Sequence, residues 1–234
     1  MLNHKKKVIE NNSAIYRGVR ANQRRETILT VWKYCILKSL YLSLKFNTAT
    51  YYMIEITETR IPEVLLLKPK VFRDDRGFFL ETYREEHLQA KGIEVHFVQD
   101  NLSKSQKGTV RGLHYQIAQP QDKLIMVMQG VILDVAVDLR ENSSTFGQYT
   151  AMELSGRNKH QLFIPKGFAH GFSVLSDEAL VYYKCSDYYN PDGERGLYWN
   201  DPDLDIDWRV DDPVISNKDQ HQPRLKEIST KDLF

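Results

Sequence analysis

The chain contains the run Val131-Ile132-Leu133-Asp134-Val135-Ala136-Val137-Asp138-Leu139, which decides the fold class. Its odd-numbered positions are all apolar, and its two aspartates, Asp134 and Asp138, both fall on even positions. Side chains alternate between the two faces of a β-strand, so a period of two is the pattern of a strand with one apolar face. The run therefore predicts a half-buried β-strand.

Similar short segments lie on both sides of this run, and turn sequences such as Asp75-Arg76-Gly77 and Pro165-Lys166-Gly167 separate them. Strands at this spacing indicate a sandwich or a barrel rather than an alternating α/β fold. The further predicted strands are Leu65–Phe72, Val110–Ile117, Leu124–Met128, Tyr149–Leu154, Gln161–Ile164, Phe172–Leu175 and Leu180–Ser186.

Two regions depart from the strand pattern. The segment Thr82–Lys91 predicts a helix, because its apolar residues and its glutamates fall on different sides at helical spacing. The part of the chain from Asn190 onward is rich in turn residues and holds four of the eight prolines, so we expect it to wrap the barrel. The expected architecture is an all-β jelly roll with short helices and a C-terminal cover.

Charge is distributed unevenly along the chain. The formal net charge is +1, yet residues 1–52 contain ten Lys/Arg and two Glu, a net +8, and residues 53–234 contain 22 Lys/Arg and 29 Asp/Glu, a net −7. We therefore predict a boundary at Met53. Residues 1–52 are expected to be a basic, poorly ordered N-terminal extension or upstream sequence that is not native, and residues 53–234 are expected to form one domain.

The first 52 residues show the layout of neither a membrane span nor a signal peptide. Three lysines break the apolar part, Ile28–Phe46, whereas a membrane span needs roughly 18 or more uninterrupted apolar residues. The order of segments in a signal peptide is also missing, although an amphipathic helix on a membrane surface stays open. Cys35 and Cys185 offer neither a disulfide framework nor metal-ligand spacing. We expect a cytoplasmic protein with no nucleic-acid or membrane partner.

Two of the seven histidines are candidates for a functional role. His114 and His170 each follow a glycine-containing turn and lie among aromatic and apolar neighbours, which indicates the mouth of a barrel, a common place for ligands. The residues alone leave open whether each is functional or a packed core histidine. The remaining histidines are expected in solvated or packed positions: His4, His87, His96, His160 and His221.

Motifs of several other chemistries are missing from the sequence. No His-x-His pair occurs, and the residue two positions after His114 is Gln116, so a dedicated metal site is not expected. The sequence also lacks a glycine-rich dinucleotide fingerprint, a phosphate-binding loop and a nucleophile elbow. Proton transfer without a metal or an organic cofactor is the chemistry that remains.

Six motifs follow one another within residues 53–234: Arg76–Glu81, Phe97–Asn101, Arg111–Gln116, Asp134–Arg140, Ile164–Phe172 and Asp187–Tyr189. Together they resemble the dTDP-4-dehydrorhamnose 3,5-epimerase family. The resemblance implies a cupin-type double-stranded β-helix, a homodimer and a reaction without cofactor. The implied substrate is dTDP-4-dehydro-6-deoxy-D-glucose, a dTDP-4-keto-6-deoxyhexose that is inverted at C3 and C5 in dTDP-L-rhamnose biosynthesis.

The resemblance also implies four catalytic residues. An imidazole, with an ordinary pKa near 6.5, can remove the weakly acidic protons beside a 4-keto group when it is well placed. By resemblance His114 is that base, and Asp219 orients it. Lys123 stabilises the enolate, and Tyr183 returns a proton on the opposite face. Because side chains alternate along a strand, Tyr182 is expected to face away from the pocket.

The nucleotide contacts are likewise implied by the resemblance, and some are expected to cross a dimer interface. Arginines suit a pyrophosphate because of their forked donors. One residue departs from the family pattern: Asp122 stands where a glycine is frequent, which leaves open whether its carboxylate pairs with Lys123 or faces solvent. The implied binding residues are Arg76, Glu81, Gln99, Asp100, Asn101, Arg111, Lys123, His170, Glu194 and Lys218.

Two alternatives stay open on the sequence. The first is a relative that inverts only C3 or only C5 of a related dTDP-4-ketosugar. The second is a non-catalytic barrel that binds a sugar nucleotide. The presence of Tyr183 favours the double inversion, and a binding protein has no use for a paired base and acid.

Overall fold

The computed structural model describes residues 53–234. The predicted N-terminal extension, residues 1–52, lies outside the described residues, and the boundary at Met53 stays a prediction. In the described part of the chain, no helix is long and apolar enough to cross a membrane.

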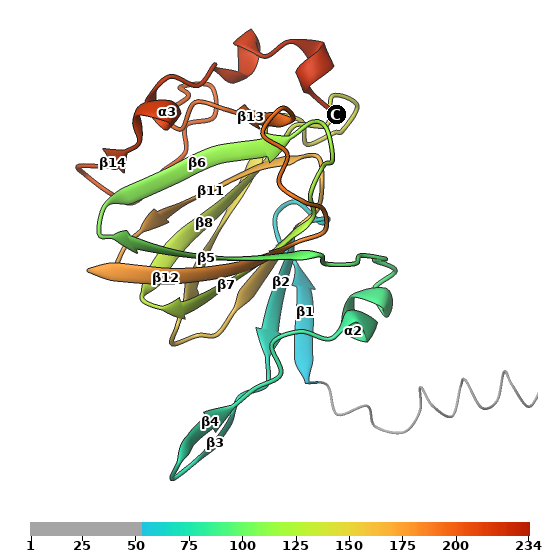
Figure 1. The fold of residues 1–234 in the computed structure, drawn as a ribbon, viewed down its shortest axis with the longest axis vertical. Helices are drawn as coiled ribbons and strands as arrows, with labels where there is room; N and C mark the ends of the chain where they lie inside the picture. Colours follow the sequence, from blue (N-terminus) through green and yellow to red (C-terminus); the bar gives the residue numbers. More distant parts are fainter. Residues whose placement is uncertain (1–52) are drawn as a thin grey trace, which may run out of the picture. The chain divides into compact units, whose positions relative to one another are not determined.

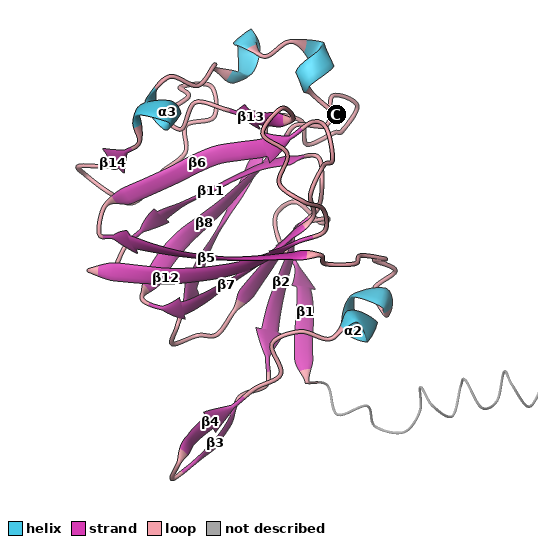
Figure 2. Ribbon diagram, in the orientation of Figure 1, coloured by secondary structure: helices cyan, strands magenta, loops and turns pink. Residues whose placement is uncertain are grey.

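Two sheets of mostly antiparallel strands face each other and form the body of the domain (Figures 1 and 2). Strands that are distant in sequence are neighbours in space, because the chain crosses repeatedly between the sheets, as in a jelly roll. In order across the first sheet, the strands are β1 (Ile54–Glu58), β2 (Leu65–Pro69), β10 (Gln161–Ile164), β7 (Lys123–Gln129), β12 (Glu178–Cys185) and β5 (Gln99–Gln106). The second contains β13 (Glu194–Gly196), β6 (Thr109–Gln116), β11 (Phe168–Val174), β8 (Val131–Asp138) and β9 (Tyr149–Ser155), with β14 (Val214–Ile215) beside β6.

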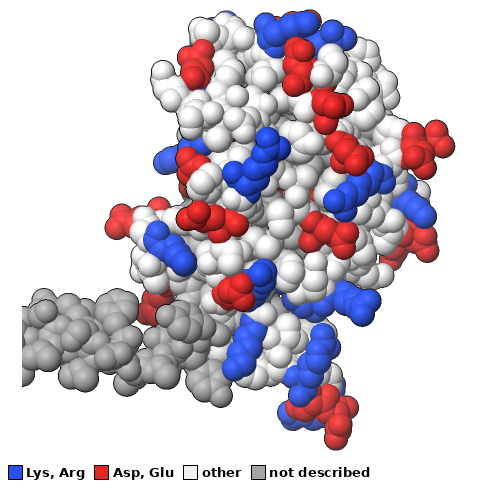
Figure 3. All heavy atoms as spheres, turned by 180° about the vertical axis from the view of Figure 1, so that it is seen from behind, with Lys and Arg blue, Asp and Glu red and all other residues white. Residues whose placement is uncertain are grey.

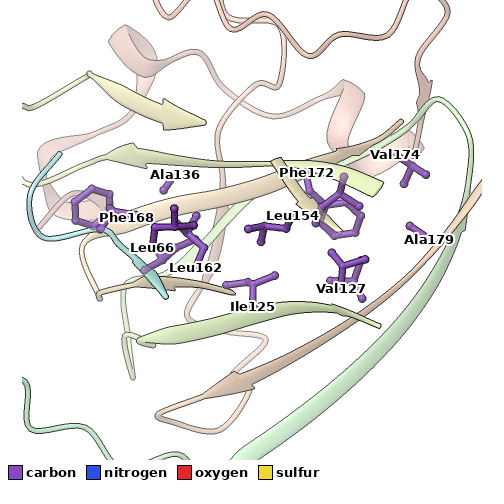
Figure 4. Packing of buried hydrophobic residues seen from close by; sticks show 14 of the residues in the cluster. Leu66, Ile125, Val127, Ala136, Leu154, Leu162, Phe168, Phe172, Val174 and Ala179 are labelled. Carbon is purple, nitrogen blue, oxygen red and sulfur yellow. The ribbon is translucent and has the colours of Figure 1, made fainter. Parts of the chain in front are cut away.

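Apolar side chains from both sheets fill the space between them (Figure 4). Ile125 and Leu162 come from the first sheet, Ala136 and Phe172 from the second, and all four are buried. Burial of each large apolar side chain stabilises the fold by about 1.5–3 kcal/mol, so this layer holds the two sheets together.

Strand β8 differs from the prediction in one respect. Its odd residues, among them Leu133 and Val135, are buried under the C-terminal segment, and its even residues face the space between the sheets. Both aspartates, Asp134 and Asp138, are fully buried. The prediction of a strand was right and the prediction of a half-buried one was wrong, because the alternation separates two buried faces.

The C-terminal segment covers the outer face of the second sheet, as predicted. Leu204, Trp208 and Phe234 pack against the apolar side chains of β6 and β8. The main-chain carbonyl of Trp208 also accepts a hydrogen bond of 2.7 Å from the buried hydroxyl of Ser173 in β11. This cover includes the short helices α3 (Asn217–Gln220), η1 (Leu225–Glu227) and η2 (Thr230–Asp232).

Several elements of the structure differ from the prediction. The predicted helix is shorter, α2 (Glu85–Gln89), and Leu88 is its one buried residue. The first predicted strand ends at Pro69, and a hairpin of β3 (Phe72–Asp74) and β4 (Gly77–Phe79) follows it. The polar strand β5 was not predicted, because its exposed residues are mostly charged or amide-bearing and it lies at a sheet edge.

Asp138 holds a buried polar network near the end of β8. Its carboxylate accepts hydrogen bonds from Arg140, Ser143 and Thr145 at 2.6–2.8 Å. Burial alone would raise the pKa of Asp138, but these donors hold it below its ordinary value. The carboxylate therefore anchors the turn that follows the strand.

We expect Asp138→Ala to lower the free energy of unfolding by about 3 kcal/mol, because it leaves several buried donors without an acceptor. A lowered folded-state pKa stabilises the protein above the ordinary aspartate value of about 4 and ceases to do so as the pH falls through the lowered value. The deficit, measured by urea denaturation, should therefore be largest near neutral pH and shrink in acid. An equal deficit at every pH would contradict this role.

Candidate functional site

A cavity of about 850 Å³ opens between the sheets beside the C-terminal cover. Its walls come from β5, β6, β11 and β12, from the first residue of β7, and from residues 214–219. Both candidate histidines line it. The predicted site residues that it brings together are Arg111, His114, Lys123, His170, Tyr183, Lys218 and Asp219.

His114 and Asp219 form a close pair although they are 105 positions apart in sequence. The imidazole Nε2 lies 2.6 Å from Asp219 Oδ1. The histidine side chain is 32% exposed and the carboxylate 4%, so the imidazole is accessible from the cavity while its partner is shielded. This arrangement fixes the ring and leaves Nδ1 as the nitrogen that can accept a proton.

Asp219 is held in place by main-chain and side-chain contacts. Ser216 caps helix α3 by accepting a hydrogen bond from the Asp219 amide, and the Gly112 amide donates to Asp219 Oδ2 at 3.3 Å. Gly112 has a φ of +108°, and a Cβ there would lie 2.6 Å from the His170 carbonyl, so the position requires glycine. Burial would raise the pKa of Asp219, but His114, Gly112 and Ser216 together hold it below its ordinary value.

Lys123 and Tyr183 face the same cavity from the first sheet. Burial lowers the pKa of Lys123, opposed by the nearby Cys185, Asp134 and Glu194. Burial also raises the pKa of Tyr183, so its hydroxyl keeps its proton at neutral pH. Thus the His114 imidazole and the Tyr183 phenol line one cavity from opposite sheets.

The structure shows where Tyr182 points and what the Asp122 carboxylate contacts, the two questions raised by the sequence around Tyr183 and Lys123. Tyr182 points to the other face of β12, where its hydroxyl accepts a hydrogen bond from Lys184, and it does not line the cavity. Asp122 accepts hydrogen bonds from the Ser186 hydroxyl and the Lys166 amide. The Asp122 carboxylate therefore bonds to these two groups and not to Lys123.

A second cavity of about 300 Å³ adjoins the first and shares His114, Lys123 and Tyr183 with it. Gln99, Asn101 and Glu194, all predicted binding residues, line this smaller space. Glu194 accepts from Lys218 Nζ at 2.6 Å and from the Tyr189 hydroxyl at 3.0 Å. The two spaces together offer room for a sugar and for parts of an attached nucleotide.

Three predicted binding residues lie outside both cavities. Arg76 is at the tip of the β3–β4 hairpin, where its side chain is 89% exposed and pairs with Asp74. Glu81 pairs with Arg84, and Asp100 pairs with Lys184 on the outer face of the sheet. Figure 1 shows the hairpin projecting from the body of the domain. Within one chain, Arg76, Glu81 and Asp100 therefore lie apart from the predicted binding residues that line the two cavities.

Several cavity residues were not singled out from the sequence. Ser103 and Ser105 continue the inward face of β5 beyond Gln99 and Asn101, and Arg111 donates a 2.8 Å hydrogen bond to Ser105. Tyr189 is 55% exposed at the smaller cavity. The period of two in β5 could have revealed the serines, but the strand itself was not predicted. Among residues 53–234, no group of three or more His, Cys, Asp or Glu side chains is placed to hold a metal ion.

Residues 58–227 match the family model described as dTDP-4-dehydrorhamnose 3,5-epimerase. The chain belongs to this epimerase family. An enzyme of that name from Methanothermobacter thermautotrophicus is 49% identical over 173 residues, which are 73% of this chain and 94% of the relative. The predicted family and enzyme class are confirmed.

Solved structures of epimerases agree with the fold. A Legionella pneumophila dTDP-6-deoxy-D-glucose-3,5-epimerase in complex with dTDP-4-keto-L-rhamnose superposes with a TM-score of 0.75 at 48% identity, covering 77% of this chain and 97% of that one. A 3'-monoepimerase from Streptomyces bikiniensis, in complex with dTDP-quinovose, reaches 0.69 at 31% identity over 73% and 88%. The likeness to these epimerases confirms the predicted cupin-type jelly roll.

Proposed function

We propose that this epimerase converts dTDP-4-dehydro-6-deoxy-D-glucose into dTDP-4-dehydro-L-rhamnose by inverting C3 and C5 in turn. The observation that carries the proposal is the His114–Asp219 pair, which faces a cavity also lined by Lys123 and Tyr183. The chemistry needs a base, a charge that stabilises an enolate, and an acid on the other face of the sugar. This cavity holds one residue suited to each task.

In the first step, His114 removes a proton from the carbon beside the keto group. The Asp219 carboxylate accepts the Nε2–H of His114, so the ring presents a neutral Nδ1 to the substrate. Once the proton has moved, the same carboxylate stabilises the imidazolium cation. Lys123 places a cation where it can lower the energy of the enolate oxygen.

Inversion requires the new proton to arrive from the opposite face of the ring. His114 belongs to β6 in the second sheet, and Tyr183 belongs to β12 in the first. The sugar ring between them would meet the base on one face and the phenol on the other. Tyr183 is therefore assigned as the proton donor for inversion at C5, the carbon at which the resemblance to the epimerase family implies a tyrosine donor.

The exposed hairpin supports the predicted homodimer. Arg76 and the neighbouring Phe78 and Phe79 are exposed, although Arg76 belongs to a motif of the epimerase resemblance. A second copy of the chain could bring its own Arg76 to the nucleotide end of this cavity.

Figure 3 shows acidic and basic side chains interspersed on the back face, which gives no continuous basic surface there for a nucleic acid. The buried free thiol of Cys185 fits the cytoplasm.

The product of the reaction tests the proposal. The full-length protein would be incubated with dTDP-4-dehydro-6-deoxy-D-glucose, and the configuration at C3 and C5 followed by proton NMR. Inversion at both carbons supports the proposal, and inversion at one alone identifies a single-site epimerase. Saturable binding without any product would identify a sugar-nucleotide-binding protein.

We expect Asp219→Asn to lower kcat by about 100-fold or more while the protein stays folded. An amide in place of the carboxylate can donate to Nε2, which stabilises the wrong tautomer of His114 and cannot support an imidazolium. Steady-state kinetics and circular dichroism of both proteins measure this. A loss confined to KM would contradict the orienting role.

A further inference from the structure

A second imidazole–carboxylate pair lies next to the first. His170 Nε2 is 3.0 Å from Asp134 Oδ1, and both side chains are at least nine-tenths buried. The two residues come from neighbouring strands, β11 and β8. His170 in β11 is also the register partner of His114 in β6. The ring of His170 lines the large cavity, and the carboxylate stands behind it.

The other oxygen of Asp134 has no hydrogen-bond partner among the described residues. Its carboxylate is fully buried, and Oδ2 is one of the few buried side-chain polar atoms without a partner in that part of the chain. A buried charge that is left unpaired is costly, so an unpaired oxygen at a functional site calls for an explanation.

Lys123 lines the same cavity as His170, and the negative charge of Asp134 acts on its ammonium group. Its ammonium group forms no ion pair with another described residue, although burial disfavours its charge and the negative charge of Asp134 favours it. The other carboxylates near the cavity have partners of their own. Asp219 pairs with His114, Glu194 with Lys218, and Asp122 with Ser186.

We propose that Asp134 is a positioning residue that orients the His170 ring through one oxygen and, through the negative charge of its carboxylate, keeps Lys123 protonated. The inference rests on the proposed function, in which a protonated Lys123 stabilises the enolate. It adds a buried carboxylate that touches no substrate but sets the charge of a residue that does.

Other titratable groups also surround Lys123, and they define what the test must separate. Cys185 and Tyr183 face it from β12, Glu194 from β13, and His114 and His170 from β6 and β11. Glu194 acts in the same direction as Asp134. Removal of the Asp134 charge alone should lower the proton affinity of Lys123, so the lysine loses its proton at a lower pH.

Asp134→Asn tests this in the full-length enzyme, because the amide keeps an oxygen that can bond to His170 and removes the charge. We expect the basic limb of the kcat/KM profile to move to lower pH, so that activity falls between pH 7 and pH 9 by about tenfold more than in the wild type. The matched control is Asp138→Asn, which removes a buried charge from the same face of the same strand. It should leave the basic limb in place.

A direct measurement of the Lys123 titration tests this inference separately from the proposed function. Carbon-13 NMR of the lysine Cε signals, with Lys123→Met to assign the resonance, should show titration at lower pH in Asp134→Asn and no change in Asp138→Asn. If Asp134→Asn folds poorly, the less bulky Asp134→Ser replaces it, and we expect the same displacement of the Lys123 titration to lower pH. An unchanged Lys123 titration overturns the inference even if the enzyme is an active epimerase. A displaced titration in a protein without epimerase activity upholds the link and overturns the function.

Discussion

His114→Ala is expected to lower kcat/KM for the dTDP-4-keto-6-deoxyhexose by about 10³-fold or more, near the upper range for loss of a general base. The imidazole is the accessible member of a 2.6 Å pair whose carboxylate is shielded, and the other histidine of the cavity is 9% exposed and bound to Asp134. Among the described residues, no other histidine of the cavity is placed to replace it. Steady-state kinetics at neutral pH measure the loss.

The matched control for this variant is His96→Ala. His96 is exposed and lines neither cavity, so its removal should leave kcat/KM within about twofold of the wild type, as for most surface substitutions. Nucleotide binding by His114→Ala, measured by calorimetry with dTDP, should be largely retained. Retention of most of the catalytic activity by His114→Ala would refute the assignment of the base.

Tyr183→Phe is expected to separate the two inversions. Loss of the hydroxyl should lower the rate of C5 inversion by about 100-fold, in the range for loss of a general acid, and leave proton exchange at C3 close to the wild-type rate. The phenol stands on the wall opposite His114, and its raised pKa keeps it protonated at the pH of the assay. Removal of a proton from C3 by His114 does not need it. Proton NMR resolves the two carbons in a single experiment.

The neighbouring residue supplies the control for this variant. Tyr182→Phe removes the same hydroxyl from the next position of β12, but that group faces away from the cavity and bonds to Lys184. It should leave both rates unchanged. An equal loss at C3 and C5 in Tyr183→Phe would assign Tyr183 to substrate binding rather than to proton donation.

Much of the fold could be predicted from residue alternation. Strand β10 has the predicted bounds, and β6 is displaced from its prediction by a single residue at each end. The buried status of both faces of β8 could not be predicted, because the residues that cover its odd face, such as Trp208 and Phe234, are far along the chain. Local sequence shows that a face is apolar and does not show what will cover it.

The site was predicted unevenly for the same physical reason. The spacing of glycines and aromatics pointed to His114 and His170, and the structure places both at the cavity. No local pattern marks Asp219, which helix α3 brings to His114 from the C-terminal cover. The pairing of Asp134 with His170 depends on strand register across β8 and β11, which side-chain alternation alone leaves undetermined.

Deuterium incorporation tests the central claim most directly. The full-length protein would be incubated with dTDP-4-dehydro-6-deoxy-D-glucose in deuterated water, and proton NMR would follow the signals at C3 and C5. The proposed mechanism predicts loss of both proton signals in the wild type and of neither in His114→Ala. Exchange at only one carbon in the wild type, or at both carbons in His114→Ala, would contradict a double inversion that depends on His114.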